Sequence, residues 1–136
     1  MIKRDARVYL AIKYDPQNRN RQLIEQLAAV IEQVGWSSHV VVRDLEAWGE
    51  KSFAPGDLME NSLALLSTCD LCLVEGSVKG VGVGIEAGYA YAKGIPVVVI
   101  ASMGTNISTT LTGIAQTILY YESPHSLAGL FPGLID

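Results

Sequence analysis

The chain has 136 residues, of which 49% are hydrophobic and 18% are charged, and its formal net charge is -4. A chain of this length suits a single core, so we expect residues 1–136 to form one domain. The ten Lys and Arg residues are scattered, which excludes the basic stripe that binds a nucleic-acid polymer or an anionic membrane.

The first part of the chain alternates strand and helix patterns. Arg7–Tyr14 is a short run rich in apolar and β-branched residues, which predicts a strand. Apolar residues then recur at helical spacing over Leu23–Val34, and Gly35 is expected to end this helix. A second strand is predicted at His39–Val42, followed by a polar loop at Asp44–Pro55.

A helix and a third strand follow this loop. Asp57 is predicted to cap the helix. The helix carries its apolar residues on one face: Leu58, Met59, Leu63 and Leu66. Asp70–Val74 is the third strand, and Glu75–Gly84 is a loop. The next helix is expected at about Ile85–Lys93, with Gly94 closing it.

The remaining elements complete the fold class. Pro96–Ala101 is the fourth strand, and its unbroken VVVI is typical of a central strand covered on both faces. A helix near Thr109–Ala115, a strand near Ile118–Tyr121 and a last helix capped near Ser123 follow. Because strands and helices alternate throughout, right-handed crossovers predict an α/β fold with a doubly wound, five-stranded parallel sheet in the order 2-1-3-4-5.

This strand order also predicts where a ligand binds. Open α/β sheets bind ligands outside the carboxyl ends of the strands, at the point where the strand order reverses. Here that point lies between the first and third strands. The segments expected to surround the ligand are Tyr9–Asp15, His39–Glu46 and Glu75–Glu86.

Five glycines crowd the segment EGSVKGVGVGIEAGYA: Gly76, Gly80, Gly82, Gly84 and Gly88. Glycines at this density let the backbone approach a ligand closely and adopt positive φ. Gly80, Gly82 and Gly84 are therefore candidate ligand-binding residues. The alternative is a loop that simply turns tightly onto a helix.

Glu86 is the candidate catalytic residue of this segment. We expect it in the first turn of the following helix, where exposed N–H groups favour the ionised carboxylate. An ionised carboxylate at the mouth of a cleft can attack an electrophilic carbon such as a sugar C1′. A Glu in the first turn also stabilises a helix by capping, and spacing alone favours neither interpretation.

Two patterns for other chemistries are incomplete. Residues Gly82–Ala87 fit a loose dinucleotide fingerprint, but residues Ala101–Met103 stand where its ribose-binding acid is required, about 20 residues later. Cys69 and Cys72 form a C-x-x-C at the start of a strand, whereas redox pairs of this kind open a helix. With only two His residues in the chain, we expect no structural metal site.

Three segments carry a resemblance to a known family. Asp70–Val99, DLCLVEGSVKGVGVGIEAGYAYAKGIPVVV, resembles the nucleoside 2-deoxyribosyltransferase superfamily. His39–Glu50, HVVVRDLEAWGE, resembles its branch of 2′-deoxynucleoside 5′-phosphate N-hydrolases, and Val8–Ala11 extends the similarity to the first strand. The resemblance implies a flavodoxin-like fold and an activity that cleaves or transfers the N-glycosidic bond of nucleosides or nucleotides without a cofactor.

The resemblance also implies roles for individual residues. Glu86 would be the nucleophile that forms a glycosyl-enzyme at C1′, Tyr9 would orient it from the first strand, and His39 would lie near the base. Each of the last two has an alternative. Tyr9 alternates within a strand and is equally typical of a core residue, while a His at a strand start is commonly a surface residue.

The sequence departs from the family pattern on the helix before the third strand. The family supplies an Asp there that orients the sugar or assists the leaving base, and Ser62 occupies that position. Ser62 is four residues from both Leu58 and Leu66, so it is predicted on the buried side of the helix, whereas Glu60 points away. Lacking this acid, the chain would be a slow enzyme, an enzyme with a changed substrate, or a binding protein.

Recognition of a 5′-phosphate is a second departure. The N-hydrolase branch has a Ser where Gly80 stands and a Gly-rich, Arg-bearing loop where Ile12–Asp15 stands. Lys79 is a candidate replacement cation, as are Lys13, Arg19 and Arg21, although each is more typical of a solvated surface charge. Ser108 lies where family members offer a hydroxyl, sometimes to a neighbouring subunit, although a Ser before a helix is also a normal cap.

Location and assembly follow from composition. The longest apolar run, Ile95–Ala101, is far shorter than the ~20 residues of a membrane span, and the start of the chain is unlike a signal peptide. We therefore expect a soluble cytoplasmic protein. The high apolar fraction, together with the habit of the family, predicts a homodimer.

The sequence thus supports two functions. The first is an enzyme, a hydrolase or base-exchanging transferase, that acts through Glu86 on a nucleoside or nucleoside 5′-monophosphate. The second is a nucleotide-binding or sensing protein that keeps the cleft and has lost catalysis.

Overall fold

Five parallel strands form the centre of the structure, a computed structural model that describes residues 2–136. The strand order is β2-β1-β3-β4-β5, and each neighbouring pair is parallel. This topology confirms the predicted flavodoxin-like α/β fold. The strands are β1 (Arg7–Ala11), β2 (Ser37–His39), β3 (Leu71–Glu75), β4 (Val97–Ser102) and β5 (Thr117–Tyr121).

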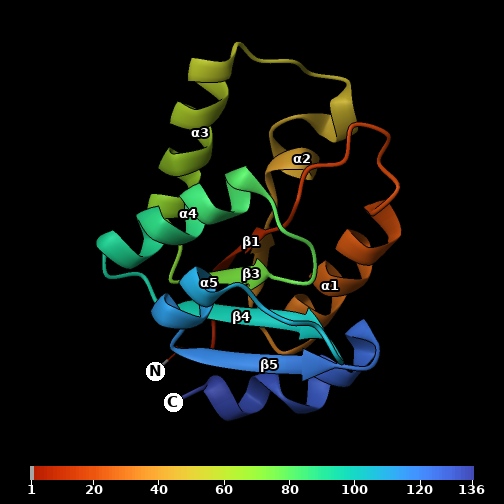
Figure 1. The fold of residues 1–136 in the computed structure, drawn as a ribbon, viewed down its shortest axis with the longest axis vertical. Helices are drawn as coiled ribbons and strands as arrows, with labels where there is room; N and C mark the ends of the chain where they lie inside the picture. The colour runs from red at the N-terminus through yellow and green to blue at the C-terminus, as the bar shows by residue number, and fades with distance from the viewer. Residues whose placement is uncertain (1) are drawn as a thin grey trace.

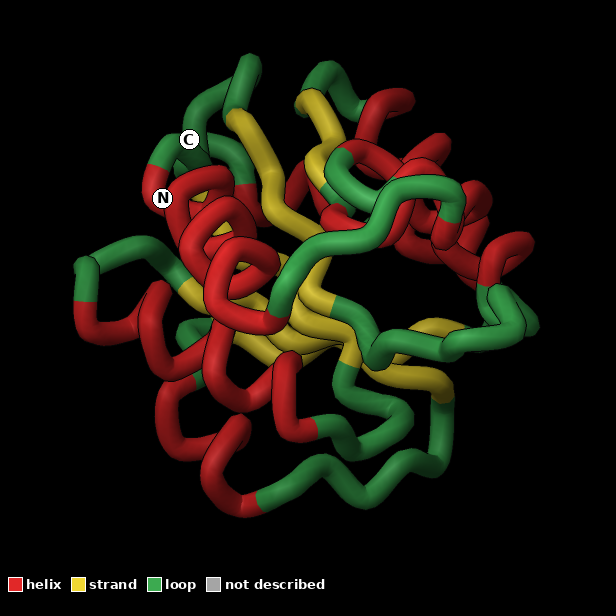
Figure 2. Tube along the Cα trace, turned by 90° about the horizontal axis from the view of Figure 1, so that it is seen from above, coloured by secondary structure: helices red, strands yellow, loops and turns green. Residues whose placement is uncertain are grey.

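Helices cover both faces of this sheet (Figures 1 and 2). The α-helices are α1 (Arg21–Gln33), α2 (Val41–Asp44), α3 (Pro55–Ser67), α4 (Val81–Ala92) and α5 (Thr109–Ile114). Three short 3-10 helices are η1 (Ala47–Gly49), η2 (Pro124–Gly129) and η3 (Phe131–Leu134). Within residues 2–136, none of the helices has the length and apolarity needed to cross a membrane.

The core is divided by the sheet into two apolar clusters. Alternate strand residues face opposite sides: Val8 and Leu10 of β1 pack with α1, η2 and η3, whereas Tyr9 and Ala11 pack with α3, α4 and α5. In β4, residues 97–101 are all buried, which confirms the prediction of a central strand covered on both faces.

The second strand differs from the sequence prediction. β2 ends at His39, and residues 41–44 form α2, so the prediction of a strand at His39–Val42 is wrong beyond its first residue. The physical reason is a local side-chain cap. The Asp44 carboxylate accepts from the Val40 N–H at 2.9 Å, and the Asp44 N–H donates to the Val40 carbonyl at 2.7 Å. These bonds turn the chain despite the β-branched run.

The glycine-rich turn also differs from its prediction. α4 begins at Val81, so Gly82 and Gly84 are helical, and Gly80 is the extended N-cap with φ -156°. The expected positive φ is absent from these glycines and occurs instead at Gly35, Gly49, Gly94 and Gly104. Gly35 and Gly94 do follow α1 and α4, as predicted.

Two other predicted helices differ from the structure, one in its start and one in its type. α3 begins at Pro55 after Ala54, and Asp57 lies in its first turn rather than at the cap. Proline is favoured at the first helical position because it lacks the N–H that would stay unpaired there. The predicted last helix after Ser123 is a pair of short 3-10 helices, η2 and η3.

Candidate active site

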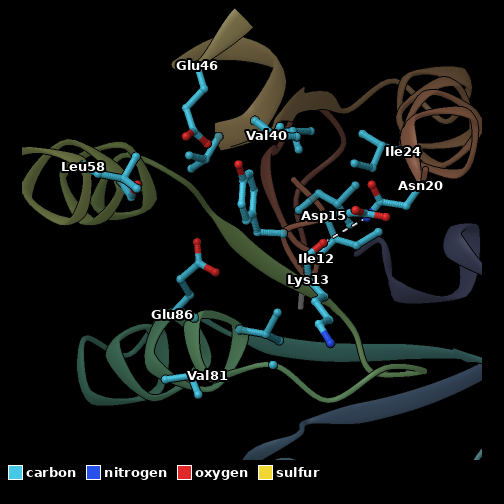
Figure 3. A pocket seen from close by; sticks show the side chains of 18 of the residues that line it. Ile12, Lys13, Asp15, Asn20, Ile24, Val40, Glu46, Leu58, Val81 and Glu86 are labelled. Carbon is cyan, nitrogen blue, oxygen red and sulfur yellow. Dashed lines mark hydrogen bonds between the residues drawn. The ribbon is translucent and has the colours of Figure 1, made fainter. Parts of the chain in front are cut away.

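A cavity of about 340 Å³ opens at the carboxyl end of β1, between α3, α4 and the segments after β1 and β2. Residues from all three predicted ligand-binding segments line it. Its walls include apolar side chains of Ile12, Val40, Val41, Leu58 and Met59 (Figure 3). Its polar side chains include Lys13, Asp15, Asn20, Glu46, Ser62 and Glu86.

Glu86 is held in this cavity by a hydrogen bond from Tyr9. Tyr9 lies in β1 and is fully buried, and its hydroxyl donates to Oε2 of Glu86. Burial and the neighbouring Glu86 raise the pKa of the Tyr9 hydroxyl, so this group stays protonated and acts as the donor. Tyr9 is therefore both a buried residue of the core and the hydrogen-bond partner of Glu86.

The environment of Glu86 corrects its predicted ionisation. Glu86 is the sixth residue of α4, so it lies in the second turn and not in the first. Burial raises the pKa of its carboxyl to about 7, and the hydrogen bond from Tyr9 offsets only part of that effect. The prediction that helix N–H groups favour the ionised form was wrong in direction, because desolvation of the carboxylate is the larger effect.

Ser62 shares the cavity with Glu86. It lies on α3 with an exposed fraction of 3%, which confirms the predicted buried orientation, while Glu60 is exposed. The structure thus brings Ser62, Gly80 and Gly82 together with Glu86.

Other predicted site residues lie outside the lining of this cavity. Gly84 is on the exposed side of α4, and Lys79 is exposed on the preceding turn. Ser108 caps α5 by accepting from the Leu111 N–H at 3.3 Å. His39 is half-buried, with its Nε2 3.0 Å from the Ser37 hydroxyl, and burial lowers its pKa.

Glu46 is the last residue of a segment expected near the ligand, but no pattern in the sequence predicts a role for it. Glu46 lines the cavity, and burial raises the pKa of its carboxyl. Asp15, in the same lining, is ion-paired with Arg19 at 2.9 Å, which lowers the pKa of Asp15. Asn20 donates to the Lys13 carbonyl at 2.9 Å and so fixes the segment after β1.

A second cavity, of about 400 Å³, adjoins the first and shares Lys13 and Asp15 with it. Glu75, at the end of β3, lines it with an exposed fraction of 3%. Its Oε1 accepts from the Ser77 N–H at 2.5 Å, and its Oε2 accepts from the hydroxyls of Ser77, at 3.1 Å, and Tyr121. The Ser77 hydroxyl also accepts from the Ser102 N–H at 2.8 Å, so this network joins the ends of β3, β4 and β5. Across residues 2–136, no three His, Cys, Asp or Glu side chains gather as a metal-binding group.

Comparison with known proteins finds similarity in sequence to a curated protein and similarity in fold to solved structures. No protein-family model matches the chain. A protein of Thermofilum pendens, whose name assigns it provisionally as 2′-deoxynucleoside 5′-phosphate N-hydrolase 1, is 26% identical over 142 residues, covering 96% of this chain and 98% of that protein.

Two solved structures share the fold along nearly the whole chain. The CMP N-glycosidase BcmB of Clostridium botulinum has a TM-score of 0.69 at 19% identity, with 95% of this chain and 99% of that chain covered. The 2-deoxyribosyltransferase of Bacillus psychrosaccharolyticus has a TM-score of 0.70 at 20% identity, with 96% of each chain covered.

Proposed function

Because this chain belongs to the nucleoside 2-deoxyribosyltransferase superfamily, we propose that it cleaves or transfers the N-glycosidic bond of a nucleoside or nucleoside 5′-monophosphate through Glu86. The observation that carries the proposal is the Glu86 carboxyl, held by the Tyr9 hydroxyl inside a cavity at the switch point of the sheet. The cavity, about 340 Å³, is within the range of small-ligand sites.

The proposed reaction has two steps at C1′. A Glu86 carboxylate oxygen bonds to C1′ as the C1′–N bond breaks, and the electron pair of that bond leaves with the base. Water, or a second base, then attacks C1′ from the vacated side and releases the Glu86 carboxylate. Negative charge on Glu86 stabilises the oxocarbenium-like transition state of each step.

The surroundings of Glu86 suit a nucleophile that works near neutral pH. A pKa of about 7 leaves a substantial ionised fraction there, and a partly buried carboxylate is less shielded by water than an exposed one. Tyr9 supports the ionised form by its hydrogen bond and fixes the orientation of the carboxyl group. The apolar walls formed by Val41, Leu58 and Met59 suit the faces of a base or sugar.

A binding or sensing protein is the second candidate function. Ser62 favours it, because a hydroxyl lines the cavity where the family resemblance implies an acid, and a serine hydroxyl is a poor proton donor at neutral pH. In that case Glu86 would contribute to ligand affinity and not to turnover.

One experiment separates these functions. The purified protein is incubated with ribo- and 2′-deoxynucleosides and their 5′-monophosphates, with and without an acceptor base, and free base is followed by chromatography. The variant Glu86→Gln keeps the size of the side chain, and Glu60→Gln, on the exposed side of α3, is the matched control. We expect base release or exchange by the parent and by Glu60→Gln, with loss in Glu86→Gln. Binding without turnover by the parent would support the sensing function.

The homodimer stays a prediction, and the outer face of α4 supports it. Val81, Ile85 and Tyr91 of this helix are exposed, with Val81 at 83%. Large apolar side chains exposed on one helix favour association. Light scattering after size exclusion tests this prediction, which a mass of one chain would contradict.

A further inference from the structure

Glu46 faces Glu86 across the cavity. Glu46 follows α2 on one side, and Glu86 lies on α4 on the other; Figure 3 shows their carboxyl groups directed toward one another. The Glu46 carboxyl has no hydrogen bond or ion pair with any side chain of residues 2–136. A second acid is therefore present and unengaged on the wall opposite the proposed nucleophile.

The backbone around Glu46 is held in an unusual conformation. The Glu46 carbonyl accepts from the N–H groups of Gly49 and Lys51, each at 2.9 Å. Ala47 and Trp48, which follow Glu46, have φ of 48° and 58°, in the left-handed region that favours glycine. Such residues cost about 1 kcal/mol or more each and persist only where surrounding contacts hold them.

Contacts from the segment after β1 supply that support. The Asn18 side-chain amide donates to the Trp48 carbonyl at 2.7 Å, and the Arg21 guanidinium lies 4.4 Å from the centre of the Trp48 ring. Trp48 also packs against the apolar cluster on the α1 side of the sheet. The turn that carries Glu46 is thus fixed to the rest of the cavity wall.

The proposed reaction requires a proton on the departing base. When the C1′–N bond breaks, a neutral base leaves with an extra electron pair, and protonation during departure makes it a much better leaving group. Of the other ionisable groups in the lining, Asp15 is ion-paired with Arg19, and Glu86 must be ionised to attack. Lys13 and Tyr14, which also line the cavity, are weaker acids than a carboxyl group.

We infer that Glu46 is the general acid that protonates the leaving base, an inference that rests on the proposed function of the same site. In the first step, the Glu46 carboxyl gives its proton to a ring atom of the base as Glu86 bonds to C1′. In the second step, the Glu46 carboxylate takes a proton from the attacking water or from the second base. The cycle returns Glu86 ionised and Glu46 protonated, and the net reaction adds one water, or exchanges one base. Burial of Glu46, which raises its pKa, favours the protonated form that this role needs.

A pair of substrates tests this role against a merely structural one. A purine 2′-deoxynucleoside needs a proton on its leaving base, whereas its N7-methylated form carries a positive charge and leaves as a neutral base without one. We expect Glu46→Gln to lower kcat/KM for the unmethylated substrate by roughly 10²- to 10⁴-fold and for the methylated one by less than about tenfold. Glu50→Gln, at an exposed position of the same loop, is the matched control and should leave both unchanged.

The pH profile gives a second measurement that works with any substrate of the parent. An alkaline decline in kcat/KM should be present in the parent and in Glu46→Asp, which keeps an acid, and should be absent from Glu46→Gln. Equal losses on both purine substrates, or an unchanged alkaline decline in Glu46→Gln, would overturn the inference. Loss of all turnover in Glu86→Gln alone supports the proposed function independently, and absence of turnover in the parent would overturn both proposals.

Discussion

Replacing Glu86 with Gln should stabilise the protein above neutral pH and have a smaller effect at acidic pH. Burial raises the pKa of this carboxyl from an ordinary 4.5 to about 7. The folded chain therefore holds the Glu86 proton more tightly than the unfolded chain does. The stabilising effect of that proton is fully present below pH 4.5 and is lost as the pH rises through about 7. Gln has nearly the same size, keeps an oxygen that can accept from Tyr9, and carries no charge to desolvate.

The size of the effect follows from the two pKa values. Between about pH 5 and pH 8, linkage predicts that the free energy of unfolding of the parent falls by roughly 2 to 3 kcal/mol relative to that of Glu86→Gln. Comparing both proteins at each pH cancels the titration of other groups. Urea unfolding, followed by circular dichroism, should show the difference as a midpoint shift of about 1 M. The exposed Glu60→Gln variant measures what losing one surface charge contributes. If the difference between parent and Glu86→Gln were the same at both pH values, the pKa of Glu86 would not be raised in the folded chain, and the reasoning would be refuted.

Three further predictions follow from other contacts. Tyr9→Phe removes the hydrogen bond that lowers the pKa of Glu86, so the acidic limb of the pH–rate profile should move upward from about 7 and kcat/KM at neutral pH should fall roughly tenfold or more. Gly35→Ala should destabilise the fold by about 1 kcal/mol or more in urea unfolding, because φ of Gly35 is +98° and the new Cβ would lie 3.3 Å from the Arg4 carbonyl oxygen. Gly88→Ala is the contrasting variant: it lies within α4 with open space around the new Cβ, so it should stabilise the fold by up to about 1 kcal/mol. Cys69 and Cys72 are buried free thiols with raised pKa values, so a thiol reagent at pH 8 should modify them slowly in the native protein and quickly in urea, and fast native modification would contradict that burial.

Much of the fold was predictable because its signals are local and periodic. The strand at Pro96–Ala101 was recognisable from four successive apolar residues, and Gly35 and Gly94 marked the ends of two helices. The alternation of strands with helices then fixed the strand order. β2 was misjudged because the residues after His39 favour a strand by propensity, whereas the Asp44 side chain turns the backbone by hydrogen bonding.

The position of the candidate site was predictable from the sequence, whereas its electrostatics were less so. Glu86 and Tyr9 were both expected near the switch point, but the raised pKa of Glu86 depends on how closely α4 packs on the sheet, which no local pattern records. A role for Glu46 was not predicted, because the position of its side chain depends on the left-handed backbone conformation of Ala47 and Trp48. Sequence rules reserve that conformation for glycine and a few polar residues, so neither residue gave a signal.

The pairs Tyr9–Glu86 and Tyr121–Glu75 differ in how many lone pairs of the carboxylate oxygens remain available for reaction. A carboxylate has about four acceptor sites. Within residues 2–136, three donors bind Glu75, two of them at Oε2 and one at Oε1, so the acceptor sites of this carboxylate are largely occupied in joining β3, β4 and β5. On Glu86, the Tyr9 hydroxyl engages Oε2, and no donor from residues 2–136 engages Oε1. For the proposed reaction, the ester to the sugar carbon is therefore expected on Oε1 of Glu86, and Glu75 should not replace Glu86 as a nucleophile in a Glu86→Gln variant.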